Sequence, residues 1–369
     1  MSFFGMVLTA LVTLLHIYVF WRAYSLPVCK RFSANAFLAL ACSWWLVYYL
    51  ARLFGGHSGT LPIALEFAAM HWMGSAFLLA VGFLLADVVT GFGFLFRKAV
   101  PVVRSLGLAC GVCLVLIAHV QGLRPPVVTH VAISVADLPD RLDGTRIAVM
   151  ADLHAGEMLL GPRWLSERVR QVQALQPDMV VLVGDLFERA TEPETVVPVM
   201  RRLSAPLGVW AVRGNHDSLR KGRRDVTGEI LAGAGIPLLE NTWRLAAKGL
   251  VVAGIDDLTT ARRRREAGET YLDTALKDRP PGVTLLLSHT PWLTERIAAV
   301  GVDLMISGHT HAGQIWPFPY LVMTRYPYIA GLYEIDGMPL YVNRGTGTWG
   351  PRMRLWAPGE ITLITLRFP

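Results

Sequence analysis

The sequence predicts a protein in two parts: a bundle of about four transmembrane helices at residues 1–122, and a mixed α/β domain with two packed sheets at residues 123–369. Three observations support this prediction. The mean hydropathy of +0.42, with only 17% charged residues, is too apolar for an ordinary soluble protein. The apolar excess lies at the N-terminal end. From about Pro125 onward, short β-branched runs alternate with helical stretches.

The N-terminal part holds four apolar stretches, each long enough to cross a membrane. Residues 1–21 and 32–51 contain no Asp, Glu, Lys or Arg, residues 53–86 contain only Glu66, and residues 99–122 contain only Arg104. A helix needs roughly 20 such residues to cross the hydrocarbon core, so we expect four spans. The first stretch lacks the basic leader and cleavage site of a signal peptide, and we expect it to be retained as an anchor.

Basic residues near the spans predict the side of the membrane on which the second part lies. Five occupy the linkers after the first and third spans, namely Arg22, Lys30, Arg31, Arg97 and Lys98. Only Arg52 and Arg124 occupy the opposite side. Because basic linkers tend to stay in the cytoplasm, this bias predicts an inner-membrane protein with an extracytoplasmic C-terminal domain.

Five apolar runs in the second part each end in polar residues. IAVM is followed by Asp152 and His154, MVVLV by Asp185, and VWAV by Asn215, His216 and Asp217. VTLLL is followed by His289, and LMIS by His309 and His311. Continuous Val, Ile and Leu runs are typical of buried strands. Sheets of this class place their sites at the carboxyl ends of the strands, so we expect these residues to converge.

The last part of the chain has a different pattern. The segment GLYEIDGMPLYV predicts a hairpin around Asp336 and Gly337, and EITLITLRF predicts a closing strand. The intervening segments PRWLSERVRQVQAL and TERIAAV have helical periodicity. A two-sheet sandwich flanked by helices accommodates all of these elements.

The gathered side chains indicate metal chemistry. Two aspartates, four histidines and an asparagine offer mixed oxygen and nitrogen donors without a thiolate, a set that suits Zn, Fe or Mn. One metal needs only three or four ligands, so seven suggest two metals with a bridging carboxylate. Alone, His289 would more often be a structural histidine and Asp152 a helix cap, so the prediction depends on all the motifs occurring together.

These motifs resemble those of the calcineurin-like metallophosphoesterases. D-x-H at Asp152 and His154, G-D at Asp185, G-N-H-D at residues 214–217, the histidine of LSHTP and G-H-T-H at residues 308–311 occur in that family's order. GHTHAGQ, YVNRGTG and APGEITLITL are similar to the membrane-associated bacterial branch, related to transmembrane proteins with a metallophosphoesterase domain. The resemblance covers roughly residues 128–369.

Carried over residue by residue, the resemblance implies two metal sites that share Asp185. Asp152, His154, Asp185 and His311 would hold one divalent ion, and Asp185, Asn215, His289 and His309 the other. A hydroxide between the metals would attack phosphorus, His216 would protonate the leaving oxygen, and Asp217 would orient the His216 ring. Two departures from the family, Glu188 for Asp and Ala312 for Gly, affect no implied ligand.

Two arginines and an aromatic segment are candidates for substrate contact. Arg213 and Arg344 lie beside ligand motifs and are candidates to hold phosphate, although such arginines are as often paired with carboxylates. The segment IWPFPYLVMTRYPYIAGLY contains Trp316, Phe318, Tyr320, Tyr326 and Tyr328 among prolines. Such aromatics favour the membrane interface, so we expect the segment either to enter the headgroup region beside the site or to pack against the C-terminal strands.

The leading hypothesis is a membrane-anchored, dinuclear metal-dependent phosphohydrolase, a phosphodiesterase or phosphatase, that acts on a lipid-linked phosphate or phosphodiester at the membrane surface. The alternative is a tethered hydrolase of soluble nucleotides or cell-wall phosphodiesters. A non-catalytic scaffold or sensor is disfavoured because the ligand set and His216 are intact. The pI near 9.4 does not imply nucleic acid, because no basic motif interleaved with aromatics appears. The sequence indicates no oligomeric state.

Overall fold

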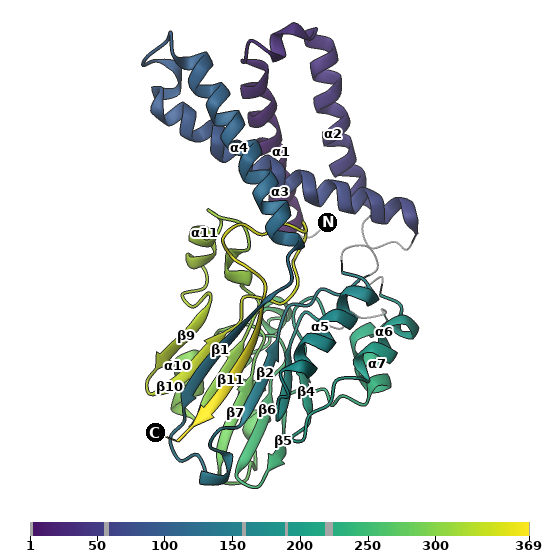
Figure 1. The fold of residues 1–369 in the computed structure, drawn as a ribbon, viewed down its shortest axis with the longest axis vertical. Coiled ribbons are helices and arrows are strands. Elements are labelled where there is room, and N and C mark those ends of the chain that lie inside the picture. The colour runs from purple at the N-terminus through teal and green to yellow at the C-terminus, as the bar shows by residue number, and fades with distance from the viewer. Residues whose placement is uncertain (1–2, 55–58, 157–159, 189–190, 218–223, 369) are drawn as a thin grey trace. The chain divides into compact units, whose positions relative to one another are not determined.

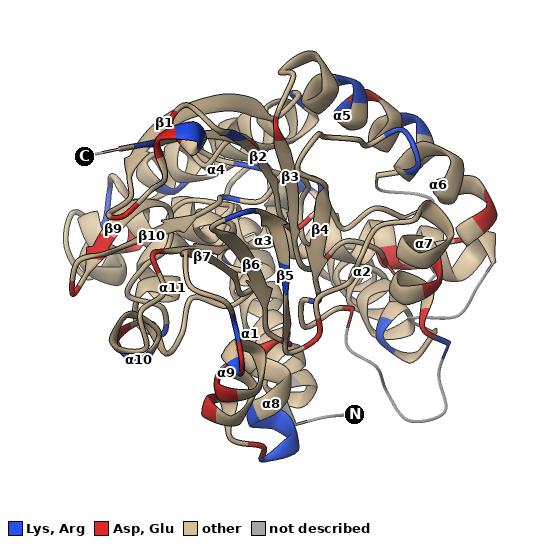
Figure 2. Cartoon of the chain, turned by 90° about the horizontal axis from the view of Figure 1, so that it is seen from below, with Lys and Arg blue, Asp and Glu red and all other residues tan. Residues whose placement is uncertain are grey.

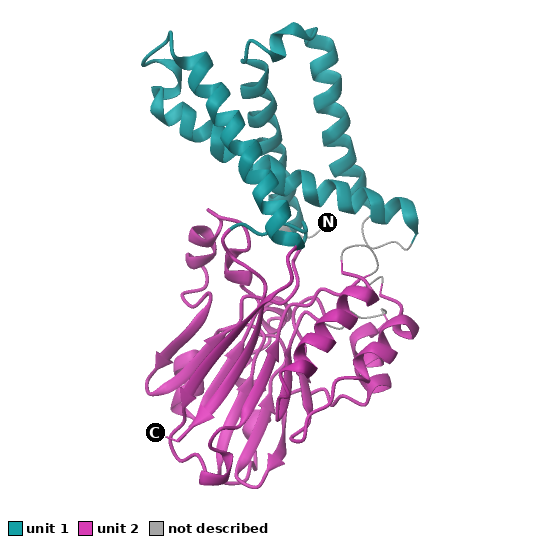
Figure 3. Cartoon of the chain, in the orientation of Figure 1, with its two compact units in different colours: residues 1–123, 350–355 teal, residues 124–349, 356–369 magenta. Residues whose placement is uncertain are grey.

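The computed structural model describes residues 3–54, 59–156, 160–188, 191–217 and 224–368 (Figure 1). These fall into two compact units, residues 1–123 with 350–355 and residues 124–349 with 356–369 (Figure 3). The first unit thus includes a short segment from near the C-terminus. Within it, the Arg354 amide donates to the Ala118 carbonyl at 2.9 Å.

The four expected spans are helices. They are α1 (Phe3–Tyr24), α2 (Ala34–Phe54), α3 (Thr60–Val89) and α4 (Val100–Leu123). Each is long and apolar enough to cross a membrane. Helices α3 and α4 approach closely where glycines meet, because a Cβ on Gly82 would lie 2.2 Å from the Gly107 carbonyl oxygen. Close packing through small residues is typical of helix pairs in membranes.

A buried ion cluster joins three of these helices. Arg22 Nε lies 2.6 Å from Asp87 Oδ2, Arg104 Nε lies 3.1 Å from Asp87 Oδ1, and the Tyr18 hydroxyl donates to Oδ2 at 2.8 Å. Arg22 and Asp87 lie near the ends of α1 and α3, and Arg104 lies near the start of α4. The cluster therefore holds three helix termini on one side of the bundle.

The second unit contains two sheets (Figure 1). The five-stranded sheet has the order β1 (Val127–Ser134), β11 (Glu360–Arg367), β2 (Arg146–Met150), β3 (Met179–Val183) and β4 (Val209–Val212). The six-stranded sheet has the order β5 (Thr242–Ala247), β6 (Leu250–Gly254), β7 (Val283–Leu287), β8 (Leu304–Ser307), β10 (Met338–Val342) and β9 (Gly331–Ile335). The five expected strands, the hairpin and the closing strand are all present; β1, β5 and β6 were not predicted.

Three apolar layers hold the unit together. Alternate residues such as Val149, Val181 and Leu287 form a core between the sheets. The outer face of the five-stranded sheet packs on α5 (Pro162–Ala174), α6 (Pro193–Met200) and α7 (Val226–Ala234). That of the six-stranded sheet packs on α8 (Leu258–Arg264), α9 (Gly268–Leu276) and α10 (Thr294–Ala299). Figure 2 shows these helices outside the strands, with many of the charged residues on them. The two-sheet sandwich flanked by helices is confirmed.

Parallel pairing sets the position of the site. Strands β2, β3 and β4 pair in parallel within one sheet, and β6, β7 and β8 pair in parallel within the other. Their carboxyl ends therefore lie together at one end of each sheet. The motif residues follow those ends.

Candidate dinuclear metal site

The loops after five strands bring the predicted ligands into two neighbouring groups. Asp152, His154 and His311 form one, and Asp185, His289 and His309 form the other; within each group the candidate ligand atoms lie within 4.8 Å of one another. Neutral imidazole and carboxylate are suitable ligands for divalent transition metals. Six of the seven predicted ligands thus form groups of the composition expected for two metal ions.

Asp185 lies between the two groups. Its Oδ2 is 3.3 Å from His289 Nε2 and 3.8 Å from His154 Nε2. Its Oδ1 accepts a hydrogen bond from the His216 amide at 2.8 Å. One carboxylate oxygen therefore faces ligand nitrogens of both groups, which is the position that a bridging ligand requires.

The backbone at the site is held in an unusual conformation. The φ angles of Asp152, His154, Asp185, His309 and His311 are positive, between 44° and 74°. Non-glycine residues rarely adopt this region, and such strain clusters at functional sites. At Gly184, with φ of 76°, a Cβ would lie 2.5 Å from His289 Nδ1, so only glycine fits there. The strained backbone conformations thus orient the side chains of the site.

Three of the four ligand histidines are oriented through the ring nitrogen that faces away from the groups. His154 Nδ1 bonds to Glu188 Oε1 at 2.8 Å, and His289 Nδ1 to the Val183 carbonyl at 2.9 Å. His309 Nε2 bonds to the Tyr326 hydroxyl at 2.8 Å, and its Nδ1 lies 3.2 Å from His289 Nε2. Metal-ligating histidines usually have such partners, which fix the tautomer and the ring orientation.

Two buried atoms of predicted ligands have no hydrogen-bond partner among the residues that the structure describes. They are His154 Nε2 and the Oδ1 of Asn215, the seventh predicted ligand. Buried polar atoms are normally satisfied, so each such exception needs an explanation. A metal ion is the partner that fits both, because each atom is an acceptor of a type that binds transition metals. The residues present therefore fit two metal ions.

Charge is concentrated among these groups. Burial alone would raise the pKa of Asp185, but the neighbouring His289 and His216 hold it well below its usual value. Burial would lower the pKa of His154, yet its bond to Glu188 raises it to about 9. At His309, burial and the nearby His289 lower the pKa to about 4. The anionic carboxylates and the neutral His309 are in protonation states that bind metal, whereas His154, whose pKa is raised, releases its proton when a metal binds.

His216 differs from the ligands in its exposure. Its side chain is 33% exposed, whereas those of His154 and Asp185 are 3% and 4% exposed. Its ring lies 4.9 Å from the His154 ring, and its Nδ1 is 3.9 Å from Glu188 Oε1. The His216 ring thus lies partly exposed beside the buried ligand groups, and with His154 and Glu188 it forms a third group whose candidate ligand atoms lie within 4.8 Å of one another.

Comparison with known proteins agrees with this geometry. Residues 145–313, which include all the strand-end motifs, match the calcineurin-like phosphoesterase family. This chain carries a calcineurin-like phosphoesterase domain. The domain is joined to four helices that are apolar and long enough to cross a membrane.

Relatives with both features are known. The chain is 33% identical over 261 residues to a transmembrane protein with metallophosphoesterase domain from Danio rerio, and 32% identical over 283 residues to the protein so named from Bos taurus. These matches cover 67% and 72% of the chain, and 59% and 64% of the relatives. An uncharacterized metallophosphoesterase from Campylobacter jejuni is 30% identical, with 67% of the chain and 65% of that protein covered. The chain thus spans about three fifths of the length of these relatives.

Asp217 in the phosphoesterase domain makes contacts other than those expected. Its carboxylate accepts from the amides of Gly214 at 2.9 Å and Leu186 at 3.1 Å, and from the Thr227 hydroxyl at 2.8 Å. Among the described residues it makes no hydrogen bond to the His216 ring. Asp217 therefore joins the loop after β3 to the loop after β4, and its implied role of orienting the His216 ring stays a prediction.

The two candidate substrate arginines also have protein partners. Arg213 is buried, and its guanidinium donates to Asp225 at 2.7 and 2.8 Å, to Glu240 at 2.7 Å and to the Asp217 carbonyl at 3.2 Å. These bonds favour a structural cross-link over phosphate binding. Arg344 Nε lies 3.6 Å from Glu360 Oε2, and its side chain is partly exposed. Phosphate contact by Arg344 stays a prediction.

Glu188 and Tyr326 contact predicted ligands, and the sequence did not reveal either contact. Glu188 was noted only as a departure from the usual Asp, and Tyr326 only as one of several aromatics. Each contacts a ligand through its outer nitrogen. The signal for Glu188 was its place three residues after Asp185, but nothing in the sequence singles out Tyr326 from Tyr328.

We expect Tyr326→Phe to weaken one of two metal sites by about 10- to 100-fold, as loss of such an outer partner usually does. The phenyl ring keeps its stacking on Trp292, 5.5 Å between centroids, and only the bond to His309 is lost. Titration of the metal-free full-length protein with Mn²⁺ measures both affinities. Tyr328→Phe, from the same segment, is the matched control, and equal effects of the two changes would contradict the role given to Tyr326.

Proposed function

We propose that the protein is a membrane-anchored, dinuclear metal-dependent phosphohydrolase that acts on a lipid-linked phosphate or phosphodiester. The observation that carries the hydrolase assignment is the pair of candidate ligand groups with Asp185 between them and the partly exposed His216 ring beside them. Bound metal ions would supply an activated water and would neutralise charge on the phosphoryl oxygens. The family of the domain agrees with this chemistry.

The chain's own residues divide the remaining work. Asp185 holds the two ligand groups together, and its Oδ1 fixes the His216 backbone. The His216 ring donates a proton to the leaving oxygen, because it is partly exposed and is not one of the seven predicted ligands. Glu188 keeps His154 oriented and lies near the His216 ring. Burial of the ligands excludes bulk water and strengthens each of these interactions.

An exposed apolar segment supports a substrate at the membrane surface. Within the expected aromatic segment, residues Pro319–Met323 form the short helix α11. Its Tyr320 and Leu321 side chains are 64% and 62% exposed, and Met323 is 49% exposed. Contiguous exposed apolar side chains on a soluble domain indicate a membrane or protein contact. Tyr and Leu on a tethered domain suit the headgroup region.

The aromatic segment is divided between the two expected environments. Trp316 lies 5.1 Å from the Trp356 ring and is only partly exposed, and Tyr328 packs against Tyr333. Tyr326 reaches the metal ligand His309, whereas α11 points its side chains outward. A short stretch of chain therefore connects an exposed apolar turn with the site.

We also propose that the phosphoesterase domain lies outside the cytoplasm. The bias of basic residues toward the linkers after α1 and α3 supports this orientation. Arg104, left out of that bias, shares Asp87 with Arg22 and so adds a sixth basic residue to the same side.

Two phosphodiesters test the lipid substrate. Hexadecyl p-nitrophenyl phosphate in vesicles and soluble methyl p-nitrophenyl phosphate have the same reacting group and differ only in the alkyl chain. We expect Tyr320→Ser with Leu321→Ser to lower turnover of the hexadecyl ester by about tenfold or more. The reason is that burial of these two apolar side chains in the membrane contributes that much binding energy. Turnover of the methyl ester should stay near the native value.

A matched control separates this effect from general damage. Leu245→Ser removes another exposed leucine, 51% exposed, on edge strand β5 at the far side of its sheet from β9. This variant should turn over both esters at the native rate. Equal loss on both esters in the α11 variant would argue against membrane contact. A native protein that prefers the methyl ester would support the soluble-substrate alternative.

A further inference from the structure

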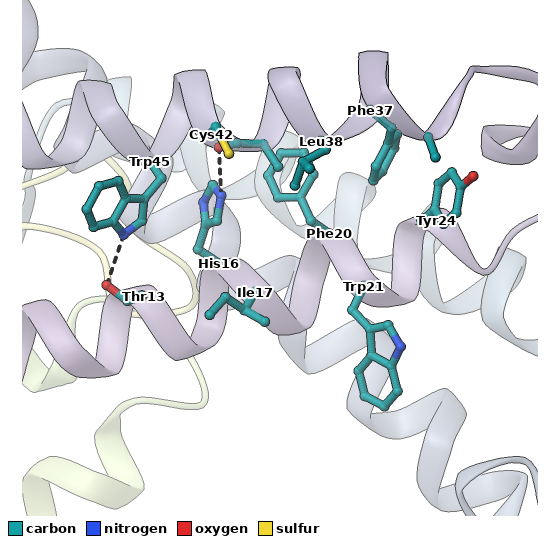
Figure 4. A pocket seen from close by; sticks show the side chains of 12 residues that line it. Thr13, His16, Ile17, Phe20, Trp21, Tyr24, Phe37, Leu38, Cys42 and Trp45 are labelled. Atoms are coloured by element: carbon teal, nitrogen blue, oxygen red, sulfur yellow. Dashed lines mark hydrogen bonds between the residues drawn. The ribbon is translucent and has the colours of Figure 1, made fainter.

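A groove about 550 Å³ in volume runs between α1 and α2 (Figure 4). Helix α1 lines it with the stripe Thr13, His16, Ile17, Phe20, Trp21 and Tyr24, and α2 lines it with Ala34, Phe37, Leu38, Ala41, Cys42 and Trp45. Small residues on α2, among them Ala41 and Cys42, leave the space open. Ile17 and Leu38 are 57% and 62% exposed, so the groove opens sideways.

Side-chain contacts join α1 to α2 at both ends of the groove. At one end Trp45 Nε1 donates to Thr13 Oγ1 at 3.1 Å, and at the other the Tyr24 and Phe37 rings lie 5.0 Å apart (Figure 4). Eleven residues of helix separate Thr13 from Tyr24, a length of about 16 Å. The hydrocarbon core is about 30 Å thick, so the groove matches the depth of one leaflet.

The middle of the groove offers no polar group to a ligand. His16 Nε2 bonds to the Ala41 carbonyl at 2.9 Å, and His16 Nδ1 accepts from Trp72 Nε1 at 3.0 Å. Both ring nitrogens are therefore in use, and the remaining surface is apolar. A ligand inside the groove has to be a hydrocarbon chain or an apolar side chain.

The loop that joins the two lining helices is basic. Residues 25–33, SLPVCKRFS, contain Lys30 and Arg31, both exposed, and no acidic residue. This loop follows Tyr24 and precedes Ala34, so it lies at the Tyr24–Phe37 end of the groove. A cationic end on an apolar groove of leaflet depth is complementary to an anionic lipid.

We infer that the membrane part binds one anionic phospholipid, with an acyl chain in the groove and its phosphate at Lys30 and Arg31. A second copy of the chain fits less well, because a helix with side chains is about 10 Å wide and side-chain contacts join α1 to α2 at both ends of the groove. The site belongs to the leaflet that contacts the linkers after α1 and α3. Its role is separate from the proposed hydrolysis.

Native mass spectrometry of the full-length protein, released from nanodiscs of equal phosphatidylglycerol and phosphatidylcholine, tests this site. We expect one retained phosphatidylglycerol per chain. Lys30→Gln with Arg31→Gln should lower the preference for phosphatidylglycerol by about tenfold or more, because each basic residue near an anionic surface contributes appreciably. Ala41→Leu, which fills the groove while keeping the backbone carbonyl that His16 contacts, should remove the bound lipid.

Matched changes make the outcome decisive. Arg97→Gln with Lys98→Gln removes two cations from the linker after α3 and should leave retention of phosphatidylglycerol unchanged. A loss equal to that of the Lys30 and Arg31 variant would show general charge attraction and would contradict the proposed site. Cys42→Leu repeats the filling test on the same face, and a thermal melt confirms that each variant is folded. The proposed lipid site would also be contradicted if both groove-filling variants kept the bound lipid, or if the protein formed a dimer without bound lipid. Hydrolysis of methyl p-nitrophenyl phosphate should be native in all of them.

Discussion

Replacing Asp185 with Asn will remove tight binding of both metal ions and lower phosphoester hydrolysis by about three orders of magnitude, or about 4 kcal/mol of transition-state stabilisation. Asp185 Oδ2 faces His289 Nε2 at 3.3 Å and His154 Nε2 at 3.8 Å, so one change affects both ligand groups. An amide keeps the shape but lacks the charge that a bridging ligand requires. Metal analysis of the purified protein and hydrolysis of methyl p-nitrophenyl phosphate measure the two effects.

A carboxylate at the other end of the same strand serves as the control. Asp178 immediately precedes β3, where its Oδ2 accepts from the Arg146 amide at 2.8 Å, whereas Asp185 follows β3. Asp178→Asn should keep both metals and near-native hydrolysis. Thermal melts of all proteins in chelator compare folding without metal. Two metals bound at native affinity by the Asp185 variant would refute the shared-ligand arrangement.

His216→Gln will lower kcat by about 10²- to 10⁴-fold and leave metal content unchanged, the range typical of a lost general acid. The ring is partly exposed, and only the backbone amide of His216 contacts Asp185, a bond that the variant keeps. The loss should be larger for a methyl leaving group than for p-nitrophenolate, because an alkoxide needs protonation and the phenolate does not. Comparing kcat for dimethyl phosphate and methyl p-nitrophenyl phosphate measures this difference.

This dependence on the leaving group separates proton donation from a structural role. His130→Gln, at an exposed histidine on β1, should change neither rate. Misplaced metals in the His216 variant would instead slow both esters equally and lower metal content. That pattern would refute the assignment of His216 as the proton donor.

How far the sequence predicted each strand depended on that strand's burial. Strands β3 and β7 are buried at every position, and their continuous apolar runs made them recognisable. Edge strand β1 buries only Ile133 and Val131 packs partly against the core, so its run VVTHVAIS carries little signal. Its place beside β11 is decided by pairing between residues more than 200 apart, Val127 with Glu360 for example. Local pattern cannot reveal such pairing.

The candidate site shows the same division. Six of the seven predicted ligands form the two groups because each follows the carboxyl end of a parallel strand, a position that sequence patterns mark clearly. Their outer partners are not marked in this way. The loops folded over the strand ends decide that Tyr326, and not Tyr328, contacts His309. They also decide that Arg213 pairs with Asp225 and Glu240.

The sequence by itself determined the two-part architecture, the four apolar helices, the strand-end positions of the candidate ligands and the resemblance to a family, because hydropathy and ordered motifs are local properties of the chain. Only the tertiary structure decided that Asp185 stands between the two ligand groups and that Asp217 joins the loops after β3 and β4. It alone decided that α1 and α2 leave a groove of leaflet depth. These are relations between segments far apart in the chain, fixed by packing and hydrogen bonds that form only when the chain is folded.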